Sequence, residues 1–192
     1  MLRLLIVAEL ISLDAYNGAE AGWTMAKRGN VGLYERYRAS WERIEGSLDA
    51  GYYFEAIAIE ESIISNRLTS FLHGVGSVKP YEAAGLDSKG HPNHMAFATV
   101  IKKWRERMDG DSRWESCPVL IEDVNRWRLQ RNKALHALAQ SFPGQEPALT
   151  TEEFIAMAHE TALKGANLAR AVSKWHKRQR TRAKKIGLLP IS

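Results

Sequence analysis

The sequence predicts an all-α protein, an up-and-down bundle of four to five helices with a long loop after the second helix and a basic extension of the last. Apolar residues recur at spacings of three and four along five segments, and no strand pattern follows residue 30. The chain has 192 residues, 45% of them hydrophobic, which is enough for one sizeable core.

The first two predicted helices run from 31 to 49 and from 52 to about 72, and Gly51 separates them. The apolar face of the first consists of Tyr34, Tyr37, Trp41, Ile44 and Leu48. That of the second consists of Tyr53, Ile57, Ile64, Leu68 and Phe71. Glu60 lies on this second face, where a buried carboxylate requires a partner.

A loop is predicted over residues 73–92, because four glycines and two prolines fall within this stretch. Asn93 is the expected N-cap of the third helix, which ends near Met108. The inward residues of that helix are Phe97, Val100, Ile101 and Trp104. His73, His91 and His94 lie in or beside the loop without a carboxylate cluster, so no metal site is expected there.

The fourth helix is predicted to be capped by Ser116, to carry Pro118 in its first turn and to end near Ser141. Its apolar stripe contains Leu120, Val124, Trp127, Arg131, Leu135 and Leu138. The fifth helix begins with Thr150 and Glu153, which have the spacing of a capping box. Its seam, rich in small residues, contains Phe154, Ala158, Thr161, Gly165, Leu168, Val172 and Trp175.

We expect three parts: a peripheral N-terminal segment (1–28), a helical domain (29–178) and a basic C-terminal tail (179–192). The apolar start of the chain contains Glu9 and lacks a small-residue cleavage site, so it is not interpreted as a signal peptide. It would form a short strand or helix on the body, or precede a natural start at Met25. No segment is long enough to cross a membrane.

Cys117 is the only cysteine, which excludes an internal disulfide and a cysteine-based zinc site. This cysteine count fits a cytoplasmic protein, and no context that would activate the thiol is visible. The sequence also lacks a glycine loop of the kind that cradles phosphates. Neither a cofactor nor a metal is therefore expected.

The positive charge is concentrated near the C-terminus. The net charge is +5, but residues 174–185 hold seven Lys or Arg and no acid, which leaves the rest of the chain at −2. Such a segment attracts phosphates. The RNA-binding residues expected from it are Lys174, Lys177, Arg178, Arg180 and Arg182. The alternative is a solvated helix end whose cations favour the helix dipole.

The informative stretch of the fourth helix is 124–141. At 100° per residue, Arg131 and His136 lie about 140° apart around the helix axis. Arg131 falls on the apolar stripe, whereas His136 shares a polar line with Asn125, Arg128 and Asn132. Asn132 precedes His136 by four residues, so the two side chains can meet. A polar line of this kind suits a helix that faces a partner or a charged substrate.

A non-catalytic interpretation of the same residues stays open, in which the protein is a helical module that binds RNA or a protein partner. Arg131 would stack on Trp127 and pair with Glu60 across the bundle. His136 would then be a partly exposed histidine near a helix end. An arginine and a histidine five residues apart occur often by chance.

Residues 127–138, WRLQRNKALHAL, resemble the signature of the HEPN superfamily, whose members carry Arg-x(4–6)-His on the penultimate core helix, commonly with Asn after the Arg. Arg131, Asn132 and His136 match this motif. The stretch YFEAIAIEESIISNRLTSFL is similar to an earlier core helix of the family. The resemblance covers about residues 31–176 in helix order and is specific over the fourth helix.

The resemblance implies a metal-independent endoribonuclease of a toxin or anti-phage defence system, with a composite cleft formed by two copies of the chain. His136 would transfer protons, Arg131 would bind phosphate, and Asn132 would orient His136 or bind a phosphate oxygen. Glu60 would support Arg131, and Arg128 would support the site. An antitoxin or regulatory partner is expected. Some family toxins are modified on a Tyr two residues after the His, but Leu138 stands here, so silencing by that route is not expected.

Overall fold

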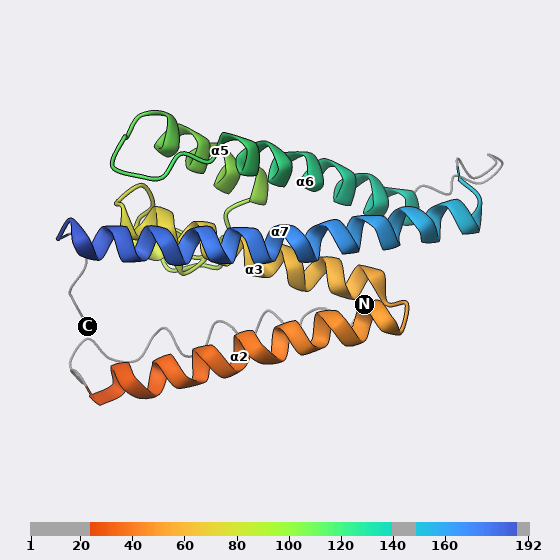
Figure 1. Ribbon diagram of the computed structural model, residues 1–192, viewed down its shortest axis with the longest axis horizontal. Helices are drawn as coiled ribbons and strands as arrows, with labels where there is room; N and C mark the ends of the chain where they lie inside the picture. The colour runs from red at the N-terminus through yellow and green to blue at the C-terminus, as the bar shows by residue number, and fades with distance from the viewer. Residues whose placement is uncertain (1–23, 140–148, 188–192) are drawn as a thin grey trace.

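The computed structural model describes residues 24–139 and 149–187, which form helices joined by loops (Figure 1). The helices are α2 (Thr24–Asp49), α3 (Tyr53–Gly74), α4 (Pro80–Ala83), α5 (Phe97–Asp109), α6 (Pro118–Ala139) and α7 (Thr151–Lys185). Within these two ranges no strand occurs beyond one isolated bridge between Leu86 and Pro92. The predicted all-α bundle is confirmed, and its last helix continues through the basic segment.

Helix α7 lies along the middle of the bundle and packs against both α3 and α6 (Figure 1). It runs parallel to α3. Near the start of the two helices the ring of Tyr53 lies 4.8 Å from that of His159. Near their ends Phe71 contacts Trp175 at the same centroid distance, 4.8 Å. The two helices therefore share a long interface.

Helix α6 runs antiparallel to α7, and two tryptophans fix the register. Nε1 of Trp127 donates to the backbone oxygen of Thr161 at 2.8 Å. At the other end, Nε1 of Trp175 donates to the backbone oxygen of Glu115, just before α6, at 3.5 Å. The second half of α6 therefore lies beside the first turns of α7, and the basic half of α7 lies at the opposite end of the bundle.

Small side chains let α7 approach α3 closely. The buried residues of this seam include Ala158, Ala162, Gly165, Ala166 and Ala169. A Cβ atom on Gly165 would overlap the carboxylate of Glu60 and lie 2.7 Å from Cζ2 of Trp127. The predicted close-packing seam is confirmed, and Gly165 is the point where a side chain does not fit.

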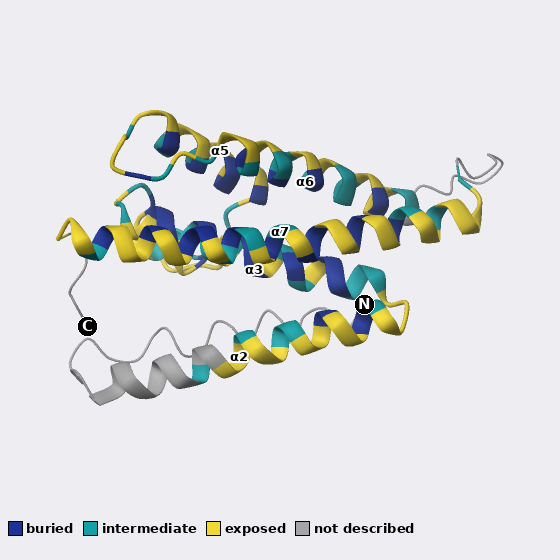
Figure 2. Cartoon of the chain, viewed as in Figure 1, coloured by how far each residue is buried: buried dark blue, intermediate teal, exposed yellow. Residues whose placement is uncertain are grey.

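The interior is aromatic at its centre, and the buried faces of the helices turn inward (Figure 2). Trp104, Trp127 and Trp175 are at most 1% exposed. The rings of Trp104 and Trp175 meet edge to face at 5.0 Å, a favoured geometry for aromatic pairs. These tryptophans are core residues, as their helical spacing predicts.

The capping box predicted at the start of the last helix is confirmed. Thr150 Oγ1 accepts a hydrogen bond from the backbone N–H of Glu153 at 3.2 Å. The Glu153 carboxylate in turn accepts from the backbone N–H of Thr150 at 2.8 Å. The reciprocal pair satisfies two N–H groups that the first turn leaves without helical partners.

Four predicted positions differ from the structure. Helix α2 begins at Thr24, so the predicted start at residue 31 and the boundary after residue 28 fall inside it. The prediction of Asn93 as an N-cap is wrong, because its backbone N–H bonds to the oxygen of Gly85 at 2.7 Å and Ala96 is the N-cap of α5. The boundary after residue 178 falls inside α7, where Gln179 and Ala183 are buried.

Two further differences concern the loop and the stripe of α6. The long loop is not wholly irregular, because Pro80–Ala83 form one short helix in it. Leu135, predicted to face the core, is 38% exposed, and Ala134 takes the buried position. The expectations for residues 1–23, the end of the fourth helix at Ser141 and the side chains of Tyr34 and Leu138 lie outside the described residues.

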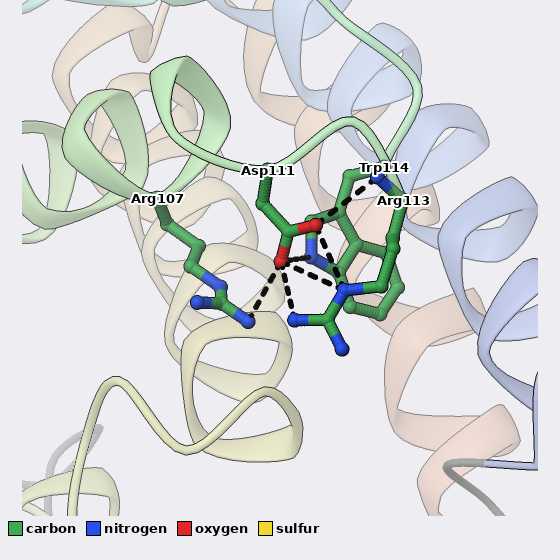
Figure 3. A network of polar contacts seen from close by, with 4 residues as sticks. All are labelled: Arg107, Asp111, Arg113 and Trp114. Atoms are coloured by element: carbon green, nitrogen blue, oxygen red, sulfur yellow. Dashed lines mark hydrogen bonds and ion pairs between the residues drawn. The ribbon is translucent and has the colours of Figure 1, made fainter.

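Asp111 holds the connection between α5 and α6 (Figure 3). Its carboxylate accepts from Nε1 of the buried Trp114 at 3.1 Å and from the guanidinium of Arg113 at 2.7 Å. Arg107, on α5, completes the group with an ion pair at 3.1 Å. Hydrogen bonds from Arg113 are the main cause that holds the pKa of Asp111 well below its usual range.

Replacing Gly165 by alanine tests the close approach. We expect the G165A variant to lower the free energy of unfolding by about 1–3 kcal/mol, because the overlap with Glu60 and Trp127 outweighs the better helix propensity of alanine. The matched control is Gly46→Ala in α2, where a Cβ meets nothing within 4 Å. That variant should be neutral or stabilising by about 1 kcal/mol. Equal effects in urea denaturation would contradict the tight contact.

Candidate functional site

Helix α6 carries the motif residues and is anchored by its own core face. Val124, Trp127 and Ala134 are buried, and the bond from Trp127 to Thr161 fixes the helix against α7. Arg131 stands one turn after Trp127, on the side that faces α3. Its side chain is 15% exposed, so the guanidinium lies at the edge of the core.

Arg131 forms its ion pair with Glu61 of α3, and the NH2 group donates to Oε1. The predicted partner, Glu60, is therefore wrong. Residues 60 and 61 differ by 100° around α3, and the long arginine side chain reaches the one at the margin of the buried face. Burial raises the pKa of Glu61, and the charge of Arg131 opposes that rise.

The sequence contains a signal for Glu61 that was missed. Glu61 follows Ile57 by four residues and precedes Leu68 by seven, so it fits the apolar face as well as Glu60 does. The periodicity cannot rank two adjacent carboxylates on one broad face. Only the position of α6 decides which one meets Arg131.

Glu60 is sealed in the interior. It is 0% exposed, and neither carboxylate oxygen has a hydrogen-bond partner among the described residues. Its oxygen Oε2 lies against the Cα of Gly165, in the space left by the missing side chain. Burial raises its pKa to about 8, against a smaller opposing effect of Arg170. Glu60 is thus a mostly protonated core residue at neutral pH.

The polar line of α6 faces outward. His136 is exposed and Asn132 is half-buried, and no hydrogen bond joins them within the described part of the chain. Arg128 donates from Nε to Oδ1 of Asn125 at 3.2 Å, so it is held along its own helix. Arg131 and His136 point to different sides of α6, and the single chain does not bring them together.

The basic half of α7 divides into two faces. Arg178 donates to the carboxylate of Glu115 at 2.9 Å, on the side facing the α5–α6 connection. Arg182 lies on that same side. Lys174 and Arg180 line a cleft on the other side, against α3, and Lys177 lies between the two faces. The five residues predicted to bind RNA are therefore divided between two faces of α7.

The basic segment is also far from the motif. Trp127 is level with Thr161, His136 lies nine residues beyond Trp127, and Lys177 lies sixteen residues from Thr161 in the opposite direction. At 1.5 Å per residue the two sites are about 35 Å apart along the helix axes. One chain thus presents the histidine and the cationic cleft at opposite ends.

The other candidates have structural roles. Cys117 is half-buried, and burial followed by the charge of Glu115 raises its thiol pKa to about 12, which makes it a poor nucleophile. His91 contacts Asp87 at 3.3 Å inside the loop, and the ring of His94 packs over Gly85. In the ranges that the structure describes, no three metal-ligating side chains come together, and no helix is long and apolar enough to cross a membrane.

The buried Glu60 gives a prediction for stability against pH. Its pKa is about 8 in the folded chain and near 4.5 in the unfolded chain, so the unfolded state loses its proton first. The free energy of unfolding should therefore fall as pH rises from 4.5 to 8 and the loss should be complete above 8. Its size is on the order of a few kcal/mol.

The substitution that tests this is Glu60→Gln, which keeps the shape and removes the titration. The gain of this variant over the wild type should grow between pH 5 and pH 8, as measured by urea denaturation. Glu35→Gln, on the exposed side of α2, is the control and should give no such trend. A gain from E60Q that stays constant with pH would show that Glu60 does not titrate in this range.

Comparison with models of protein families, with curated proteins and with solved structures found no match to this chain. Three features of the chain itself therefore bear on its function: the Arg131–Glu61 pair, the exposed His136 and the cationic cleft of α7.

Proposed function

We propose that this protein is a metal-independent endoribonuclease that uses Arg131 and His136. The observation that carries the proposal is the difference in burial and pairing between these two side chains of α6. Arg131 is held at the core edge by Glu61, whereas His136 is exposed and has no competing partner among the described residues. RNA cleavage uses a fixed cation for the phosphate and a free imidazole for proton transfer, and α6 presents one of each on different sides.

The reaction needs two proton transfers and one phosphate contact. A base takes the proton of the ribose 2′-OH, and the oxygen then bonds to the adjacent phosphorus. The bond from phosphorus to the 5′ oxygen breaks, and an acid protonates that oxygen. The products are a 2′,3′-cyclic phosphate and a 5′-hydroxyl. His136 suits both transfers because an imidazole ordinarily titrates near neutrality.

Arg131 has the role of stabilising the extra negative charge that develops on the phosphate. Its pairing with Glu61 uses the NH2 group and its Nε atom is buried, so the NH1 group is the donor left for a phosphate oxygen. Glu61, and not Glu60, is thus the residue that positions Arg131. Asn132, one residue further along, orients His136 or binds a phosphate oxygen once substrate is present.

A second copy of the chain completes the site in this proposal. Leu129 precedes His136 by seven residues, so it lies on nearly the same line of α6, and it is 53% exposed. Leu135, beside His136, is also exposed at 38%. Exposed leucines around a candidate site favour an interface. Two α6 helices packed through this face would bring two copies of His136 into one cleft, where one acts as base and the other as acid.

A biological role as a toxin or anti-phage effector belongs to the same proposal. An enzyme that cuts cellular RNA must be restrained, and a protein partner that covers the α6 face would do so by occlusion. The corresponding cellular observation is growth arrest when the wild type is expressed and normal growth when the inactive variant is expressed in its place.

Loss of His136 should abolish cleavage. We expect His136→Ala to lower the rate of RNA cleavage by 10²–10⁴-fold, the usual range for a general acid or base, and wild-type products to carry 2′,3′-cyclic phosphate ends. His73→Ala is the control, because His73 is also an exposed histidine in the last turn of its helix. Equal cleavage by wild type and H136A, or no cleavage of any RNA by the wild type, would contradict the proposal.

Disrupting the proposed dimer should also reduce RNA cleavage, while the helical fold of each chain is retained. Leu129→Asp places a charge on the exposed line of α6 and should convert a dimer into a monomer in light scattering, with cleavage reduced at least tenfold. The melting temperature should change little, because the side chain is largely exposed. A wild type that cleaves RNA as a strict monomer would remove the composite site.

A non-catalytic RNA-binding module is the second candidate, and it is favoured by Lys174 and Arg180, which form no ion pair with a described carboxylate. RNA binding would then survive His136→Ala and weaken on substitution of Lys174 and Arg180. Substitution is the better test than truncation, because Gln179 and Ala183 of the same segment are buried.

A further inference from the structure

A cleft of about 510 Å³ opens between α3 and the C-terminal half of α7. Five basic side chains line it and no carboxylate does: Arg67 from α3 and Lys174, Lys177, Arg180 and Lys184 from α7. The hydroxyl groups of Ser173 and Thr181 and the imidazole of His176 complete its wall. The cleft is therefore lined entirely by cations and hydrogen-bonding groups.

Three of the cations that line the cleft have no carboxylate partner among the described residues. Lys174, Lys177 and Arg180 form no ion pair with a described carboxylate. Two other arginines of α7 are paired with carboxylates: Arg178 with Glu115 at 2.9 Å and Arg170 with Glu45 at 3.3 Å. Gathering like charges in one hollow costs electrostatic energy, and a multivalent anion would relieve it.

Part of the cleft is held in place before any ligand binds. The guanidinium of Arg67 lies 3.8 Å from the ring centroid of Tyr37 on α2, which fixes its plane. Its Nε atom and the Oγ of Ser173 are buried and have no hydrogen-bond partner in the described structure. His176 is 4% exposed, and burial together with Arg67 and Arg180 lowers its pKa to about 4. The imidazole is thus neutral and able to donate one hydrogen bond.

We propose that this cleft binds an oligophosphate chain. The cations converge from two helices on one hollow of nucleotide size, which suits several phosphates in a row. No Phe, Tyr or Trp lines the cleft, so no platform for stacking a base is present there. Recognition is of the phosphates and not of the base, and it does not depend on the ribonuclease proposal.

The test is calorimetric titration of the full-length protein with inorganic tripolyphosphate at physiological salt. We expect saturable binding, at least tenfold tighter than that of orthophosphate, because one phosphate reaches only part of the cation set. ATP and GTP should bind equally well. An RNA with a 5′-triphosphate compared with the same RNA bearing a 5′-hydroxyl distinguishes an RNA end from a free nucleotide as the source of the chain.

A pair of arginines two residues apart on α7 provides the matched variants. Arg180→Gln should weaken tripolyphosphate binding at least tenfold, and Arg182→Gln, on the other face, should change it less than twofold. Both side chains are exposed, so both variants should fold, as checked by thermal melting. Arg67→Gln should also weaken tripolyphosphate binding, which tests whether α3 contributes to the cleft.

Three results would overturn the proposal: no binding of tripolyphosphate, equal binding of orthophosphate, or equal effects of R180Q and R182Q. Since His136 is about 35 Å away, H136A should bind tripolyphosphate like the wild type. Failure of RNA cleavage and failure of this site are therefore separate results.

Discussion

Gly165 lets α7 approach α3 so closely that the Glu60 carboxylate occupies the place of a side chain. The small residues on either side of it, from Ala158 to Ala169, continue the same contact along α7. Two consequences follow from this register. Glu61 is placed at the edge of the interface, where Arg131 reaches it, and Arg67 is placed beside the basic half of α7. Both candidate sites therefore depend on one helix–helix contact.

Those parts of the fold could be predicted from the sequence in which apolar residues recur at the helical period or a local motif marks a helix end. The long helices, the Thr150–Glu153 capping box and the inward tryptophans all follow from spacing. Local signals failed where tertiary contacts compete with them. Asn93 has the chemistry of a cap, but its backbone N–H is already bound to Gly85 in the loop, so α5 begins after Ala96.

The candidate site was predictable only in part, for a related reason. Periodicity identifies residues on a face but not the partner that each one meets across the interface. It therefore placed Arg131 on the apolar stripe, where the structure has it at the core edge, but paired it with the wrong one of two adjacent glutamates. In the same way it grouped the cations of α7 as one segment. The structure separates Arg178, paired with Glu115, from Arg180, which faces the cleft.

The relation between the two proposed sites can be judged from the elements that join them. Glu61 and Arg67 lie six residues apart on α3, about 9 Å along its axis, so one helix contributes to both. Coupling between sites, however, requires an element with two arrangements whose balance both ligands shift. The α3–α7 contact is packed so tightly at Gly165 that one added carbon atom would overlap Glu60 and Trp127, and the structure shows a single arrangement of it. A phosphate ligand in the cleft would therefore act by retaining or positioning what it is attached to, and not by changing the geometry at Arg131.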